Sequence, residues 1–276
     1  RDARRAPPSR RHTAGLAALA LLLLLPIAAI GPAQEPSAYA ASAAEPSRPA
    51  GRPKFGRISP RLLAALLEDL DATQASRRQD AANTLGLLRT SDAVGALAAH
   101  LRSDPDAYVR ETAAWALGRI GSPEATEPLS AAARSDASEA VRALAVWSLG
   151  QITDPATLST LEAALADADG PVRRRAAWAI GTIAPRRAPA ALLAALRDSD
   201  PTVREAAAWA LGQTRDPAAV PGLAAALRDT RSKASFEAQW ALARIGGETA
   251  RPHLTDVLSH VSTDSKLRGV IAKALA

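Results

Sequence analysis

The sequence contains no cysteine and no methionine, and only nine of its 276 residues are aromatic. The lack of cysteine excludes disulfides, thiolate metal sites, iron–sulfur clusters and cysteine nucleophiles. Because there is no methionine, Arg1 is not a translation start, and we expect the chain to be a processed product or a piece of a longer protein. The scarcity of Phe and Tyr in a chain that is 47% hydrophobic favours a core of helices packed through Ala and Leu.

The net positive charge of the chain comes from its N-terminal part. Residues 1–57 hold nine Lys/Arg and three Asp/Glu, a net charge of +6 that equals the net charge of the whole chain. Residues 58–276 are therefore neutral overall. Because nucleic-acid binding requires a concentrated basic face that displaces counterions, we expect no nucleic-acid partner.

The first thirty residues have the order of an export signal or a membrane anchor. A basic flank over residues 1–13 carries five arginines and precedes an uncharged apolar run over residues 14–30. This order is typical of a signal peptide, and also of a transmembrane helix whose arginines stay in the cytoplasm. Both alternatives place the remainder of the chain outside the cytoplasm, so we expect a protein of the cell envelope that is exported or membrane-anchored.

Residues 31–57 have the composition of a tether. They contain five prolines among Ala, Ser and Gly, and they include no apolar stretch that could form a core. Prolines keep such a segment extended. We predict a disordered Pro/Ala-rich linker here.

Residues 58–276 repeat one unit, and four residue types share its register. The tryptophans are spaced by 32, 31, 31 and 31 residues. An Asp lies eleven residues before each Trp, an Arg five residues before the first four, and a Gly three residues after the first four. The positions are Trp115, Trp147, Trp178, Trp209 and Trp240; Asp104, Asp136, Asp167, Asp198 and Asp229; Arg110, Arg142, Arg173 and Arg204; and Gly118, Gly150, Gly181 and Gly212.

Each unit is interpreted as two helices joined by an Asp-containing turn. The first helix is an Ala/Leu stretch such as residues 188–196. The second, such as residues 109–120, has apolar residues at helical spacing along one stripe. An Asp or Ser of the turn is suited to cap the second helix, and the Leu-Gly pairs are interpreted as its end. The units near both ends deviate from the pattern, with Asn83 and Lys273 at the Trp position.

The segments VRETAAWALG at residues 109–118 and VREAAAWALG at residues 203–212 resemble bacterial HEAT repeats of the short variety first named for phycobilin-lyase subunits. The resemblance covers residues 58–276. It implies an all-α, right-handed α-solenoid of about six to seven two-helix repeats, preceded here by one hydrophobic helix and a linker. It also implies that the second helices line the concave face, and that the protein binds partners more often than it catalyses reactions. No residue matches a bilin-attachment activity.

The recurrent Asp and Arg residues have two interpretations. They could form a polar ladder for a ligand, or each Arg could reach the turn Asp of its own or the adjacent unit and hold the stack together through charge-assisted hydrogen bonds. We favour the structural ladder, made of Asp104, Arg110, Asp136, Arg142, Asp167, Arg173, Asp198 and Arg204, because the pair defines the repeat.

The tryptophans also have two interpretations. On a helical wheel, Trp115 falls well off the core stripe, on a flank or the exposed side of the second helix. Each indole could seal the seam to the next unit against small residues. Alternatively, Trp115, Trp147, Trp178, Trp209 and Trp240 could form an aromatic ladder on the concave face that grips an extended partner. An indole has two faces and an edge, so both functions can hold together.

No motif for catalysis or cofactor binding is recognised. The set His253, Asp256 and His260 lies on one side of a predicted helix, but its spacing fits a solvated face better than a metal site. The basic clusters at residues 173–175 and 186–187 are largely offset by nearby Asp residues. We expect no catalytic residue, no cofactor and no metal.

The sequence therefore predicts a non-catalytic interaction scaffold that binds a protein or peptide on its concave face, with a membrane contact through residues 14–30 if these are not cleaved. The alternative is the C-terminal sensory or scaffold region of a larger membrane enzyme, because the basic flank, apolar run and tether weakly resemble the end of a beta-lactam-sensor-type metallopeptidase. A bilin lyase subunit is disfavoured by the export signal.

Overall fold

The computed structural model of the chain describes residues 58–229, 233–260 and 265–275. The predicted basic flank, apolar helix and linker of residues 1–57 lie outside these ranges. None of the helices in the described ranges is both long enough and apolar enough to cross a bilayer. All described helices lie in the part of the chain from residue 58 onward, where the repeat array was predicted.

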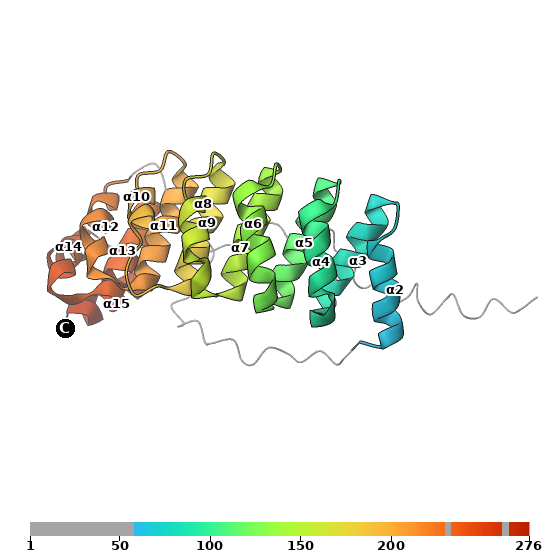
Figure 1. Cartoon of the computed structure of the whole chain (residues 1–276). Helices are drawn as coiled ribbons and strands as arrows, with labels where there is room; N and C mark the ends of the chain where they lie inside the picture. The colour runs from blue at the N-terminus through green and yellow to red at the C-terminus, as the bar shows by residue number, and fades with distance from the viewer. Residues whose placement is uncertain (1–57, 230–232, 261–264, 276) are drawn as a thin grey trace, which may run out of the picture.

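Within the described residues the regular structure is entirely helical and forms seven consecutive helix pairs. The first helices of the pairs are α2 (Pro60–Leu70), α4 (Val94–Ser103), α6 (Thr126–Ser135), α8 (Leu158–Ala164), α10 (Ala190–Ala195), α12 (Val220–Ala226) and α14 (Gly247–His260). The second helices are α3 (Ala75–Leu88), α5 (Ala107–Ile120), α7 (Glu139–Ile152), α9 (Gly170–Ile183), α11 (Pro201–Thr214), α13 (Ala234–Ile245) and α15 (Ser265–Leu275). The pairs stand in a single row in chain order (Figure 1). The all-α repeat solenoid is confirmed.

The turn residues start the second helices in two different ways. Asp106 and Asp200 cap α5 and α11 through their side chains, which accept hydrogen bonds from backbone N–H groups of the first turn. Ser138 and Asp169 occupy the same place before α7 and α9, but their side chains make no cap bond. The capping prediction is therefore right for α5 and α11 and wrong for α7 and α9.

The Leu-Gly pairs do not end the second helices, so that interpretation is wrong. Gly118 lies inside α5, which continues to Ile120. The helices end instead at residues with left-handed backbone conformation, which are Arg89, Gly121, Thr153, Ala184 and Arg215. Four of these five are not glycine, which is why a search for terminal glycines places the helix ends too early.

The core is a continuous layer of Leu, Ala, Val and Ile between first and second helices. The second helices pack closely against one another from α3 to α13, whereas successive first helices touch much less. We call the side formed by the second helices the concave face, as the family resemblance implies; its curvature stays a prediction. The handedness of the solenoid stays a prediction.

Candidate binding surface

The recurrent Asp and Arg side chains join each repeat to the next. The Nε of Arg110 donates to Oδ2 of Asp136 at 2.8 Å, and its Nη2 donates to Oδ1 of the same carboxylate at 3.0 Å. The same two-point contact joins Arg142 to Asp167 and Arg173 to Asp198. Such paired hydrogen bonds fix the orientation of both groups. We call this row of contacts the turn ladder.

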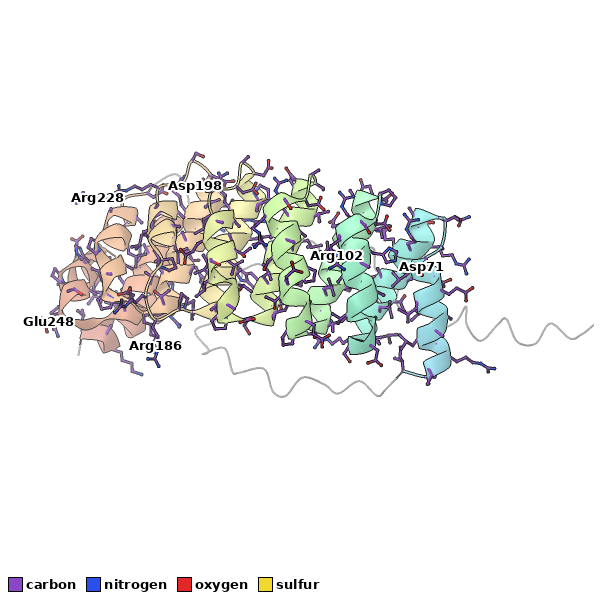
Figure 2. All side chains as sticks on the ribbon, in the orientation of Figure 1. Asp71, Arg102, Arg186, Asp198, Arg228 and Glu248 are labelled. Carbon is purple, nitrogen blue, oxygen red and sulfur yellow. The ribbon has the colours of Figure 1, made fainter. Side chains whose placement is uncertain are left out.

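Each ladder arginine also holds the turn of its own repeat. The Nη1 of Arg110 donates to the backbone carbonyl of Asp104 at 3.0 Å, and Nη1 of Arg173 donates to that of Asp167 at 3.0 Å. One guanidinium therefore donates hydrogen bonds both to the backbone of one turn and to the carboxylate of the next. Figure 2 shows Asp198 at the edge of the array where these turns lie, with Arg186 at the opposite edge.

The ladder extends one contact beyond the predicted set at each end. Arg78 of the first pair donates to Asp104 through Nε and Nη2, at 2.7 and 2.8 Å. Arg204 donates to Asp229 at 2.6 Å. Both Arg78 and Asp229 keep the register in the sequence, so the signal that finds them is the repeat itself.

The ladder carboxylates are held ionised. Burial of Asp104 by itself raises its pKa, but hydrogen bonds from Arg78, from the backbone N–H of Asp106 and from His100 outweigh burial and lower the pKa to about 2. The pKa values of Asp136 and Asp167 are lowered in the same way, against the effect of burial, by Arg110 and Arg142 respectively. Because the Arg and Asp groups of the ladder are paired with one another, they leave little unpaired charge that could bind a ligand.

The tryptophans lie on the concave side at two depths. Trp115 is buried, with 3% of its surface exposed. Trp147, Trp178, Trp209 and Trp240 are half-buried and pack with part of their surface against the core. The structure therefore brings the predicted Trp positions into one column along the second helices. Their role in binding a partner stays a prediction.

Glycines of one repeat receive the indoles of the next. A Cβ atom placed on Gly86 would lie 2.7 Å from Cζ3 of Trp115, and one placed on Gly150 would lie 2.9 Å from Cζ3 of Trp178. A Cβ on Gly181 would likewise overlap Trp209. At these three joints the missing side chain of the glycine makes room for the indole, whereas Gly118 faces Ser148 and Gly212 faces Ala241. The sequence predicts such a seam contact with small residues of the next unit, but at these three joints the indole lies against the glycine of the preceding unit.

Side chains one helical turn before and after each Trp share its face of the helix. On the N-terminal side of the five tryptophans they are Glu111, Ala143, Arg174, Glu205 and Phe236, and on the C-terminal side Arg119, Gln151, Thr182, Gln213 and Arg244; Gln79 and Leu87 flank Asn83, which occupies the Trp position of the first repeat. Arg244 is bound to the preceding repeat through the carbonyl of Gly212 and Oε1 of Gln213. The concave face is therefore mixed in charge and varies from repeat to repeat.

The charge of Glu205 on α11 acts on the buried carboxyl group of Glu237 on α13. Glu237 is buried, and burial together with the nearby charge of Glu205 raises its pKa to about 7, although Lys233 lowers it. Glu205 accepts a hydrogen bond from the backbone N–H of Lys233 at 2.9 Å. The charged form of Glu237 is therefore disfavoured in the fold.

The other candidate residues are not brought together. Arg173 belongs to the turn ladder at the start of α9, while Arg186 and Arg187 are exposed in the connection after its end, so the two basic clusters lie at opposite edges (Figure 2). His253 is half-buried and Asp256 is exposed, and the side chain of His260 lies outside the described residues. No cluster of three potential metal ligands occurs in the described part of the chain.

The geometry of helix pairs, turn ladder and concave face is that of a helical-repeat protein. HEAT repeats match the chain at residues 59–139, 96–181, 126–200, 159–236 and 189–276. These overlapping matches cover the whole array. The chain belongs to the HEAT-repeat family.

Solved structures show the same fold. The chain resembles a designed armadillo repeat protein in complex with the peptide (KR)4, with a TM-score of 0.54 and 22% identity over 67% of this chain and 99% of that one. It also resembles the complex of CpcE and CpcF of phycocyanin lyase from Nostoc sp. PCC7120, with a TM-score of 0.52 and 23% identity over 85% and 98% of the two chains. At these identities the likeness is one of fold. None of the curated proteins compared with the chain matches it.

Proposed function

We propose that the array is a non-catalytic scaffold that binds an extended segment of a partner protein along its concave face. The observation that carries the proposal is the column of four half-buried tryptophans, Trp147, Trp178, Trp209 and Trp240, on the face formed by the second helices. Each supplies a rigid aromatic surface at a spacing set by the repeat. Aromatic side chains of this kind dominate the energetics of protein interfaces.

The fold supports this proposal. HEAT and armadillo-like solenoids present extended concave surfaces, and the similar designed armadillo protein is in complex with a peptide. The turn ladder is internally paired and lies at an edge, so it stabilises the stack and leaves the concave face for the partner.

Binding can be tested without altering the fold. Peptides selected from a random display library on the array would be synthesised, and each would be titrated into protein labelled with ¹⁵N. We expect the indole N–H signals of Trp147, Trp178 and Trp209 to shift on binding, and Trp→Ala changes at these positions to weaken the affinity. Selected peptides that shift none of these indole signals would refute the concave-face proposal.

We further propose that residues 14–30 direct the protein to the cell envelope, as a cleaved signal or a retained anchor. The support is the order of basic flank, apolar run and Pro-rich linker in the sequence. Residues 1–57, preceded by an initiating methionine, would be fused to a reporter enzyme that is active only after export. We expect reporter activity, and its loss when Leu23 is replaced by Arg. An inactive reporter with intact residues 1–57 would contradict export.

A further inference from the structure

Buried polar atoms without a hydrogen-bond partner gather in one place on the array. Seven such side-chain atoms occur in the part of the chain that the structure describes, and six of them lie between Asn83 and Thr126. Four belong to the concave-face helices α3 and α5 and to the residue that ends α3: Asn83 Oδ1, Arg89 Nε, Trp115 Nε1 and Arg119 Nε. Buried polar atoms in native proteins are nearly always paired, so a cluster of unpaired ones calls for an occupant.

These four groups belong to one neighbourhood. A Cβ on Gly86 would lie 2.7 Å from the Trp115 ring, and Gly86 stands three residues after Asn83 and three before Arg89. The guanidinium carbon of Arg119 lies 5.9 Å from the centre of the Trp115 ring. The charge of Arg89 acts on Arg119: burial first, and then Arg89, lower the pKa of the Arg119 guanidinium.

The two arginines differ from the arginines of the turn ladder. Arg78, Arg110, Arg142 and Arg173 each bind a carboxylate in two hydrogen bonds. No carboxylate lies within ion-pair distance of Arg89 or Arg119 among the described residues. Two like charges that are half-buried side by side repel each other, and an anion between them removes that repulsion.

We propose that Arg89, Trp115 and Arg119 form an anion-binding subsite at the N-terminal end of the concave face, and that it takes the carboxylate of an acidic side chain on the extended partner. The inference rests on the proposed function and specifies the partner chemistry at one end of the surface. The three unpaired nitrogen atoms all donate, and an indole or guanidinium N–H can be satisfied only by an acceptor. The unpaired Oδ1 of Asn83 requires a donor, which the backbone N–H of a peptide supplies and a bare anion does not.

The chain provides conservative replacements for both arginines. Gly121 ends α5 at the place where Arg89 ends α3, and both have a positive φ, 70° and 51°. Gln151 and Gln213 stand one turn after Trp147 and Trp209, as Arg119 stands after Trp115. The changes Arg89→Gly and Arg119→Gln therefore introduce residues that neighbouring repeats already hold in the same conformation. Arg102→Gln, at an exposed position of α4 (labelled in Figure 2), serves as the control.

The experiment uses the full chain and a fluorescein-labelled octaglutamate peptide, with affinity measured by anisotropy and indole N–H signals followed by NMR. We expect the Trp115 signal to shift most among the five indoles. We expect the double variant Arg89→Gly, Arg119→Gln to bind at least about tenfold more weakly, because each charge-assisted hydrogen bond contributes more than one such factor. Arg102→Gln should bind as the unaltered protein does.

A second readout separates binding from structure. If the arginines serve the fold, the double variant should unfold at a lower temperature than the unaltered protein; if they serve an anion, the free variant should unfold at the same or a higher temperature, because the repulsion is gone. A lower unfolding temperature with unchanged octaglutamate affinity would overturn the subsite. So would a Trp115 signal that octaglutamate leaves in place, or a shift reproduced at equal affinity by inorganic phosphate, which would mark a site for free anions. Peptides from the display library that still shift Trp147, Trp178 and Trp209 would show in each case that the proposed function survives.

Discussion

Arg110 and Asp136 belong to neighbouring repeats, and their side chains meet in two parallel hydrogen bonds of 2.8 and 3.0 Å. The same guanidinium holds the carbonyl of Asp104 in its own turn at 3.0 Å. One side chain therefore sets the position of one helix pair relative to the next. Because both members of the pair are largely buried, the contact is not screened as a surface ion pair would be.

Replacing Arg110 by Ala is expected to lower the free energy of unfolding by about 3 kcal/mol, because it leaves Asp136 buried without its partner. The double variant Arg110→Ala, Asp136→Ala should be less destabilised than the two single effects added together. Unfolding in guanidinium chloride measures all three. Strict additivity of the two single changes would show that the contact contributes nothing.

Gly150→Ala is expected to destabilise the array by about 2 kcal/mol, because the added methyl overlaps the Trp178 ring and the backbone of Ala179 at 2.9 and 3.0 Å. Gly95→Ala is the matched control, since it also lies in a helix but has nothing within 4 Å of the added methyl. This control should stabilise by about 0.5–1 kcal/mol through helix propensity. Thermal unfolding of both variants tests the seam, and effects of equal sign would contradict it.

The array is expected to lose stability in acid as the ladder carboxylates are protonated. The pKa of Asp104 is about 2 in the folded protein and 3.8 ordinarily, so its contribution is complete above about pH 4 and is lost as the pH falls toward 2. Asp104→Asn should therefore destabilise by about 2 kcal/mol at pH 6 and progressively less toward pH 2. Urea unfolding across this range measures the difference, which should not stay constant with pH.

Glu237 has the opposite dependence. Its pKa is raised to about 7 from 4.5, so its charged form is disfavoured in the folded protein, and stability falls as the pH rises from about 4.5 to 7. Glu237→Gln is expected to stabilise the array by about 3 kcal/mol at pH 8 and to have little effect at pH 4. Glu205→Gln should lower the pKa of Glu237 and flatten the same curve. A Glu237→Gln effect that is independent of pH would refute this origin.

The repeat architecture could be predicted because its signal is local and recurs. The stripe through Val109, Ala113 and Leu117 predicts a helix, and the regular spacing of Trp, Arg and Asp shows how many repeats the chain contains. Those side chains lie where the period places them, with Val109 and Leu117 in the core. The helices and the buried residues of a single repeat can thus be predicted from its own thirty residues.

The joints between repeats were harder to predict, because they depend on how far and at what angle one pair stacks on the next. The sequence leaves open whether Arg110 binds Asp104 or Asp136, and the structure gives it the backbone of the first and the carboxylate of the second. Gly150 was interpreted as a helix end. The indole of Trp178 occupies the space that a side chain at Gly150 would fill, and this indole belongs to the next repeat. The positions of Arg89, Trp115 and Arg119 recur as Arg215, Trp240 and Arg244, but the sequence does not show that Arg119 lacks the hydrogen bonds that Arg244 makes.

Each of the five joints of the turn ladder has the same two halves, an arginine on one repeat and an aspartate on the following one. If the repeat that contains Arg142 were removed, Arg110 would face Asp167 and the joint would be chemically unchanged. If that repeat were duplicated, the new joint would again pair one arginine with one aspartate. The turn ladder therefore accommodates a change in the number of repeats, and with it in the reach of the binding face, without any change in its own residues.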